Sequence, residues 1–446
     1  MAVRRWDGLA YSAAVVLPRL PSFLFLPAIA HTLSLGDMGL LASSWVFIEL
    51  FQNLAGLGLK ASLGRFFPLA SGAADRRAVL GASLAGIAGG GILFALLAAV
   101  LRSWPPAADA LPFLGALPPR AFHALLLSAL LGNLASALFV YLRAEQKAPA
   151  FLGASALGAC LEAALLGWLW ATHRLSLPML LTAEAAKQAV MLACLALLAR
   201  RDLRPAAPPA ELRRQLAFGL WFVPIGLGEW FVTGSDRFWL GKLGSLADVG
   251  VYGFLYRFVM PLAVLFAGGL MDAHARLYKF SGADGEGLAR GLLARYLARA
   301  GALVALFSVL MPAALWSAGR LGLFPDAYLG GLPVLPLMAA VLFALYWSRY
   351  YGTVLEYRMQ ARALMGAELL IAGLSALLIP AGIHLAGARG GSLLCGSALG
   401  ALSAQIIGIA ALARLARIGG GTGPVRIGLA ALAACLGLAA LWARAR

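Results

Sequence analysis

Charged side chains are scarce in this sequence. Asp, Glu, Lys and Arg make up 12% of the 446 residues, whereas hydrophobic residues make up 62%. A soluble domain usually carries about 25% charged and about 45–50% apolar residues. The shortage of charge therefore excludes a large soluble domain. Apolar runs of about 20 residues follow one another along the chain, which predicts an all-α, polytopic membrane protein.

We predict twelve membrane-spanning helices. Their ranges are 8–31, 38–59, 79–101, 121–142, 150–171, 176–199, 216–238, 249–271, 294–318, 331–352, 364–386 and 391–413. A thirteenth run, 427–442, is short and is a candidate for an additional span. The first run is expected to stay on the protein as a helix, because it is long for a signal peptide, contains Arg19 and lacks a clear small-residue cleavage site.

Cysteine and catalytic motifs are also scarce. All four cysteines fall inside predicted spans, so neither a disulfide framework nor a zinc site with CxxC spacing is expected. The sequence has no Walker loop, no GxSxG elbow and no HExxH motif. His31 and His384 have no partners at metal-ligand spacing. We therefore expect neither an enzyme nor a bound cofactor.

Acidic residues are fewer than basic ones, 19 against 36, which gives a net charge of +17. With the amino terminus placed in the cytoplasm, most Lys and Arg residues fall in cytoplasmic segments, as the positive-inside rule requires. Anionic membrane lipids on that side account for the basic excess without a nucleic-acid partner. We expect a multi-pass protein of the bacterial cytoplasmic (inner) membrane.

One motif occurs twice. The stretch "SLGDMGL" at 34–40 matches "SLADVGV" at 245–251, and the same register pairs Gly58 with Gly269 and Arg65 with Arg276. A repeat of about half the chain length predicts two related helical lobes. The expected division is an amino-terminal lobe at 1–199, a basic, Pro-rich cytoplasmic linker at 200–215, a carboxy-terminal lobe at 216–413 and a tail at 414–446.

Several charged groups lie inside the predicted spans of the first half. Arg19 stands between Pro18 and Pro21, which predicts a kinked helix. The second span carries polar side chains at helical spacing along one face, and these are Glu49, Gln52, Asn53 and Lys60. Glu162 lies in the fifth span, and Glu184 is spaced to pair with Lys187 in the sixth. Glycines 89–91, inside a hydrophobic span, favour close helix packing.

The second half has its own charges at depth. Glu229, Thr233 and Asp236 are spaced to share one face of the seventh span, and Arg257 lies midway along the eighth. Segment 281–300 has the pattern of an amphipathic helix on the membrane surface. The aromatic and basic residues at 347–358, which include Arg349, are interpreted as an anchoring belt at the membrane boundary.

Two stretches, "LSLGDMGLLASSWVFIELFQNLAGLGLKASLGRFFP" at 33–68 and "LAFGLWFVPIGLGEWFVTGSDRFWLGKLGSLADVGVYGFLYRF" at 216–258, resemble the Wzx-type oligosaccharide-lipid flippases. These belong to the multidrug/oligosaccharidyl-lipid/polysaccharide exporter (MOP) superfamily. The resemblance implies two six-helix lobes in a V around a central cavity. It also implies a substrate of undecaprenyl-diphosphate-linked oligosaccharide, with a polysaccharide polymerase and glycosyltransferases as partners. Lipid II flippases, a sister family, usually have fourteen spans.

For such a substrate, Arg19 and Arg257 are the expected ligands of the diphosphate, because a guanidinium bonds paired oxygens and keeps its charge. The other expected substrate-binding residues are Glu49, Asn53, Arg65 and Arg276. Glu229, Asp236 and Glu162 are candidates for coupling to H⁺ or Na⁺. Two alternatives stay open: the arginines form structural ion pairs with Glu49, Glu162 or Glu229, and the carboxylates on the seventh span serve as a fixed counter-ion to Arg257.

Two other functions compete with this one. The first is an ion-coupled multidrug exporter of the same superfamily, which glycan-export and drug-resistance assays would separate from a flippase. The second is a membrane-embedded glycosyltransferase or ligase acting on lipid-linked sugars. Such enzymes carry catalytic groups on large outer loops, whereas the longest outer loop here, 102–120, has Asp109 as its single carboxylate and no histidine.

Overall fold

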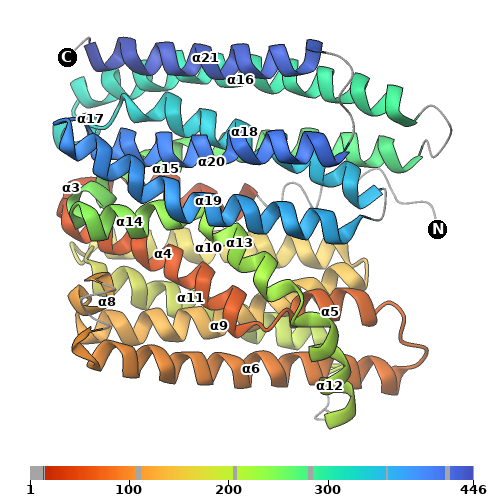
Figure 1. Cartoon of the computed structure of the whole chain (residues 1–446). Helices are drawn as coiled ribbons and strands as arrows, with labels where there is room; N and C mark the ends of the chain where they lie inside the picture. The colour runs from red at the N-terminus through yellow and green to blue at the C-terminus, as the bar shows by residue number, and fades with distance from the viewer. Residues whose placement is uncertain are drawn as a thin grey trace. The chain divides into compact units, whose positions relative to one another are not determined.

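The computed structural model describes residues 14, 16–106, 112–203, 208–279, 285–357, 360–416 and 422–444. Helices are the regular structure throughout these ranges (Figure 1). The chain forms two compact units, Met1–Leu227 and Gly228–Arg446, and the boundary falls inside α13 (Phe222–Thr233). The sequence-based domain limits at 199 and 216 stay a prediction, and the contacts group residues up to 227 with the first unit.

The first unit contains a broken amino-terminal helix followed by longer ones. Its elements are η1 (Leu17–Arg19), α2 (Leu20–Leu24), α3 (Leu26–Thr32), α4 (Leu35–Ala55), α5 (Leu59–Phe66), α6 (Ala73–Ser103), α8 (Pro112–Ala116), α9 (Pro119–Ala144), α10 (Ala148–Ala171), α11 (Leu177–Ala199), α12 (Pro209–Gly219) and the first half of α13. The second unit contains α14 (Ser235–Leu243), α15 (Leu246–Lys279), α16 (Gly285–Arg320), α17 (Asp326–Leu329), α18 (Val334–Tyr357), α19 (Ala361–Ala388), α20 (Leu393–Ala416) and α21 (Thr422–Arg444).

Ten helices in the described ranges are long and apolar enough to cross a membrane, and the bent pair α12 and α13 raises the number to eleven. The prediction of an all-α polytopic membrane protein is therefore confirmed. The predicted first span is short and broken, and the helix of the thirteenth run, α21, has a shorter apolar part at Gly428–Arg444. Proline explains the broken first span: Pro18 is the second residue of the 3₁₀ turn, Pro21 is the second residue of α2, and Phe25 separates α2 from α3. The predicted kink is confirmed.

The repeated motif forms the same structure in both units. Ser34 caps α4, where its Oγ accepts a hydrogen bond of 3.0 Å from the backbone N–H of Asp37. Ser245 caps α15 in the same way, with its Oγ 3.1 Å from the backbone N–H of Asp248. A Ser side chain at this position satisfies one of the free N–H groups of the first turn. The repeat is thus a duplicated helix start.

Two predictions of local structure are wrong. Glu229 and Asp236 do not share one helical face, because Gly234 ends α13 and caps α14 with non-helical backbone angles. α12 and α13 are also bent by 46° relative to each other. Segment 281–300 does not form a separate surface helix, because α16 runs without a break from Gly285 to Arg320.

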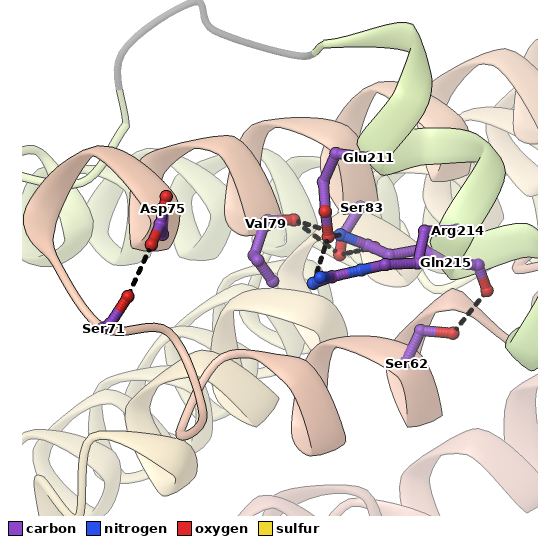
Figure 2. A network of polar contacts seen from close by, with 8 residues as sticks. All are labelled: Ser62, Ser71, Asp75, Val79, Ser83, Glu211, Arg214 and Gln215. Atoms are coloured by element: carbon purple, nitrogen blue, oxygen red, sulfur yellow. Dashed lines mark hydrogen bonds and ion pairs between the residues drawn. The ribbon is translucent and has the colours of Figure 1, made fainter.

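α12 packs against α5 and α6 in the first unit through one buried side chain, Gln215 (Figure 2). Its Nε2 donates to the carbonyl of Val79 at 2.9 Å and to Oε1 of Glu211 at 3.0 Å. Its Oε1 accepts from Ser83 at 2.6 Å, and its backbone carbonyl accepts from Ser62 at 2.8 Å. Since a buried amide is stable only when its hydrogen bonds are made, these contacts specify where α12 lies.

The second unit is organised around α18, which contacts α15, α16, α19, α20 and α21. Within the second unit, α19 and α20 form the most extensive helix pair, and glycines let their two backbones touch. A Cβ built on Gly396 would lie 2.5 Å from the carbonyl oxygen of Gly382. Small residues at such contacts are typical of helix packing in membranes. In the first unit, a Cβ on Gly90 would lie 2.5 Å from the carbonyl oxygen of Ala55 and one on Gly91 would lie 2.4 Å from the Leu130 side chain, whereas one on Gly89 would meet nothing within 4 Å. The predicted close packing is therefore confirmed at Gly90 and Gly91. α21 lies along α16 (Figure 1).

Candidate functional site

A mostly buried ion cluster joins α10 to α11 midway along both helices of the first unit. The ammonium of Lys187 lies 2.8 Å from Oε2 of Glu162 and 2.7 Å from Oε2 of Glu184. Gln188 donates a hydrogen bond of 2.8 Å to the other oxygen of Glu184. The predicted pairing of Glu184 with Lys187 is confirmed, and Glu162 shares the same cation. With all three groups ionised, the cluster has one carboxylate in excess.

Uncharged amides gather near this cluster. Asn133 of α9 is completely buried, and neither polar atom of its side chain has a hydrogen-bond partner among the described residues. Beside it, a Cβ built on Gly132 would lie 3.2 Å from Nε2 of Gln52 and 3.4 Å from Cδ of Gln188. A buried amide without partners costs about 1–3 kcal/mol. Stability alone therefore does not explain an asparagine at this position.

α4 ends in a turn that brings it close to α12 and α13. Leu57 and Gly58 both have left-handed backbones, with φ of 49° and 67°. A side chain at Gly58 would overlap the carbonyl group of Gly219 on α12. Nδ2 of Asn53 donates a hydrogen bond of 3.3 Å to the carbonyl of Gly226 on α13. Asn53, predicted to bind substrate, therefore ties α4 to the start of α13.

The cations of the first unit differ in their surroundings. Arg19 is exposed at the end of η1, and Lys60 is partly buried in the first turn of α5. Neither forms a salt bridge within the described part of the chain. α5 lies outside the candidate spans, and burial lowers the pKa of Lys60 to about 8. The exposed guanidinium of Arg65 lies 5.2 Å from the ring centroid of Phe218 on α12. Glu49 is exposed on α4.

In the second unit, Glu229 accepts a hydrogen bond from the guanidinium of Arg349 on α18. Half of the Glu229 side chain is exposed. Arg349 also lies 5.7 Å from the ring centroid of Tyr346, and Glu368 of α19 is near enough to act on its charge. The sequence left open whether the carboxylates of the seventh span pair with Arg257. For Glu229, the structure gives Arg349 as an ion-pair partner.

Asp236 and Arg237 form a second, more deeply buried pair at the start of α14. Oδ1 of Asp236 accepts a hydrogen bond of 2.8 Å from the backbone N–H of Arg237 and lies 3.9 Å from Nη1 of its guanidinium. The guanidinium lies 3.9 Å from the ring centroid of Tyr256 on α15. Asp236 is therefore held by its own neighbour and differs from Glu229 in both burial and partner.

Arg257 lies partly buried midway along α15. It is close to Tyr328 on α17, which lies outside the candidate spans. Burial raises the pKa of Tyr328, and the positive charge of Arg257 opposes that rise. The Tyr328 hydroxyl is buried without a hydrogen-bond partner in the described ranges. Arg276 belongs to α15, but its side chain lies outside the described residues.

Four side chains with evident roles in these contacts were not predicted as site residues: Lys60, Asn133, Arg237 and Arg349. Each carried a weak signal. Asn133 interrupts an apolar run, Arg237 directly follows Asp236, and Lys60 was already placed on the polar face of the second span. Arg349 looked like a boundary anchor because it lies among aromatic residues. No group of three His, Cys, Asp or Glu side chains able to hold a metal ion occurs within the described residues.

Spans, broken helices and buried ion pairs define the class first: a polytopic all-α membrane protein with the MOP transporter fold. An inward-closed structure of the lipid II flippase MurJ is similar, with a TM-score of 0.71 and 12% identity over 96% of this chain and 91% of that chain. An inward-facing multidrug resistance MATE family transporter of the MOP superfamily has a TM-score of 0.65 and 15% identity, over 91% and 98%. The structure of VcmN, a MATE transporter of Vibrio cholerae, has a TM-score of 0.55 and 16% identity, over 92% of this chain and 96% of that chain.

The particular family follows from the sequence. The family described as "Polysaccharide biosynthesis protein" matches residues 6–273, which is more than half of the chain. The chain belongs to that family. No curated protein matches it significantly. The resemblance to Wzx-type flippases is thereby confirmed at the level of family and superfamily fold.

Proposed function

We propose that this protein is a flippase that moves undecaprenyl-diphosphate-linked oligosaccharide from the inner to the outer leaflet of the bacterial cytoplasmic membrane by alternating access. Membership of a polysaccharide biosynthesis family supports a glycan-related substrate. One observation carries the proposal. The first unit pairs Lys187, whose side chain is 12% exposed, with two carboxylates, yet it leaves Arg19 and Lys60 without a salt bridge among the described residues.

Unpaired cations suit an anionic headgroup. Arginine at mid-depth in a bilayer costs roughly 2.5–3.5 kcal/mol on insertion scales, so its presence in a span needs a compensating interaction. A diphosphate supplies one, because its oxygens accept paired hydrogen bonds from a guanidinium. Lys60, whose pKa is lowered to about 8, regains a favourable environment when an anion binds beside it. Arg257 is proposed as a diphosphate ligand in the second unit on the chemistry of its guanidinium alone. Arg65, Arg276, Glu49 and Asn53 remain proposed substrate contacts.

The carboxylates supply candidates for ion coupling. Glu162 and Glu184 share one ammonium, so their cluster can take up one H⁺ or Na⁺ without acquiring a net positive charge. Glu229 and Asp236 each lie beside one arginine, and protonation there would release Arg349 or Arg237. We propose Glu162 as the principal coupling residue, with Glu229 and Asp236 in the second unit.

The test is transport in reconstituted vesicles, measured as the fraction of lipid-linked oligosaccharide that becomes accessible to a membrane-impermeant glycosidase. Arg19→Ala should abolish transport, Lys60→Ala should reduce it, and Arg19→Lys should retain part of it. Arg389→Ala, at an exposed arginine that ends α19, is the matched control and should transport normally. If the Arg19→Ala variant transports at the wild-type rate, at equal protein levels, then Arg19 does not bind the diphosphate and the main argument for the proposal fails.

The multidrug alternative is tested in the same vesicles. One similar structure, the MATE multidrug transporter DinF-BH, was solved in complex with rhodamine 6G. Transport of this dye by the wild-type protein, without transport of the lipid-linked oligosaccharide, would replace the flippase proposal. The reverse result would exclude drug export as the main activity. Loss of the lipid-linked oligosaccharide only when a glycosyl acceptor is present, without translocation, would point instead to the membrane-bound transferase.

A further inference from the structure

The second unit contains a cavity of about 610 Å³ at one end of its helices. Its walls come from the end of α16, from α17 and from the end of α21, and include Trp316, Arg320, Asp326, Leu329 and Trp442. Since the last turns of α16 and α21 line the same cavity, the two helices end at the same end of the unit. The cavity does not involve Glu229, Asp236 or Arg257, so it is separate from the site described above.

The local backbone explains why the cavity forms. Gly322 has a φ of +74°, which lets the chain turn directly after α16. Gly319 has no side chain, and a Cβ there would run into the Leu329 side chain, so α17 can pack closely against α16. These two glycines bring Asp326 of α17 to the same cavity as Arg320 of α16.

The side chains offer three kinds of contact at once. The guanidinium of Arg320 lies 5.2 Å from the ring centroid of Trp316, whose side chain is 47% exposed. Trp442 supplies a second indole. Arg320 and Asp326 line the same cavity, yet within the described ranges neither forms a salt bridge. A donor, an acceptor and two flat apolar surfaces are therefore all available to a ligand.

We infer that this cavity binds sugar residues of a glycan. A pyranose ring has apolar C–H faces that pack against indoles, and hydroxyl groups that accept from a guanidinium and donate to a carboxylate. A phosphate would use Arg320 but would be repelled by Asp326. The volume lies within the usual range of about 300–1,000 Å³ for small-ligand sites, which accommodates one or two sugar rings.

The inference deepens the proposed function and rests on it for its biological meaning. In the predicted orientation, α16 runs outward, so this end of the unit faces the side to which the glycan is delivered. A sugar site there would hold the glycan after translocation, ready for a reaction that transfers it to a growing chain. The site acts on the sugar, whereas Arg19, Lys60 and Arg257 are assigned to the diphosphate.

Binding of a lipid-free, phosphate-free ligand tests this. The probe is the oligosaccharide released by mild acid from the lipid-linked pool of the producing cells. Its binding to the full-length protein in lipid nanodiscs is measured by saturation-transfer NMR and calorimetry. Trp316→Ala and Trp442→Ala should each weaken binding about tenfold or more, as the loss of an aromatic hot spot does. Asp326→Asn, which removes the charged hydrogen-bond acceptor, should also weaken it. Trp316→Phe should restore most of it. Trp168→Ala, at a similarly exposed tryptophan of the first unit, should have no effect.

Three results would overturn the inference: no binding by the wild-type protein, binding that these variants leave unchanged, or binding of glycerophosphoethanolamine in place of the oligosaccharide, which would make this a lipid headgroup site. The failure of the proposed function looks different. Sugar binding that persists while vesicles show no translocation would reject the flippase but keep the cavity as a glycan site. Translocation without sugar binding would do the opposite.

Discussion

The two copies of the repeated motif start identically and then diverge. Both begin with a serine cap, Ser34 on α4 and Ser245 on α15. α4 ends after 21 residues, whereas α15 continues for 34 residues. Gly58 is left-handed and lies against Gly219, while its counterpart Gly269 lies inside a helix. The comparison shows that a duplicated sequence keeps local structure, and that neighbouring elements decide where a helix ends.

The units also differ in how they neutralise charge. The first places one ammonium between two carboxylates, in a cluster where the exposure of each side chain is 16% or less. The second places Glu229 and Arg349 together, with exposures of 50% and 36%. Burial decides how much each arrangement contributes to the free energy of unfolding, because removing one member of a buried pair leaves an uncompensated charge. An exposed pair contributes little.

The largest expected effect on stability comes from removing the cation of each charge arrangement, Lys187 in the first unit and Arg349 in the second. Lys187→Met should destabilise the protein by about 3–5 kcal/mol, because Glu162 and Glu184 lose their common cation while buried. Arg349→Met should cost about 1 kcal/mol or less, because half of the Glu229 side chain is exposed and the pair is not fully desolvated by the protein. Thermal unfolding in detergent measures both, and Lys242→Met, at an exposed lysine, is the control. Equal losses for Lys187 and Arg349 would contradict the difference in burial.

The next effect concerns the helix break. Gly58→Ala should cost about 1–3 kcal/mol from the left-handed backbone, plus the overlap with Gly219. Gly153→Ala, at a glycine inside α10 where a Cβ would have no other atom within 4 Å, should be neutral or stabilising by up to about 1 kcal/mol, because alanine favours a helix interior. Urea unfolding of the two variants compares them directly. A harmless Gly58→Ala would mean that the turn is not fixed by Gly219.

A pH dependence is expected from Lys60. Its pKa of about 8 means that it is protonated below that pH and loses its charge above it. Binding of an anionic headgroup should therefore fall as pH rises through about 8, approaching tenfold by one unit higher if the charge is required. Lys60→Arg, which stays charged, should flatten this part of the profile. Transport in vesicles buffered equally on both sides, over a pH series from neutral to moderately alkaline, measures it. A drop that persists in Lys60→Arg belongs to another group.

The smallest effect tests the shared helix start. Ser34→Ala and Ser245→Ala should each cost about 1 kcal/mol, as the loss of a helix cap usually does. Similar values for the two variants would support equivalent caps in the two units. Ser103→Ala, at a serine that ends α6, is the control and should change the unfolding free energy little. A large cost at one cap alone would show that the two motifs are not equivalent.

The sequence predicted those contacts of the candidate site that lie within one helix, and it did not predict those between distant helices. Glu184 and Lys187 lie three residues apart on one helix, so their contact follows from helix geometry. Glu229 and Arg349 are 120 residues apart, and their contact depends on how α13 and α18 pack. The expected alignment of Glu229 with Asp236 failed at Gly234, because a glycine's tendency to break a helix depends on what packs around it.

The sequence by itself determined most of the membrane-spanning helices, the kink at Pro18 and Pro21, and the two serine caps. These features are local: in lipid, a backbone must satisfy its hydrogen bonds within each span, and a cap needs only its own first turn. Tertiary structure alone decided the break after α4, the partner of Glu229, the docking of Gln215 and the cavity at Arg320 and Asp326. Each depends on helices distant in the chain, whose apolar surfaces are too alike to specify in advance which neighbours they will contact.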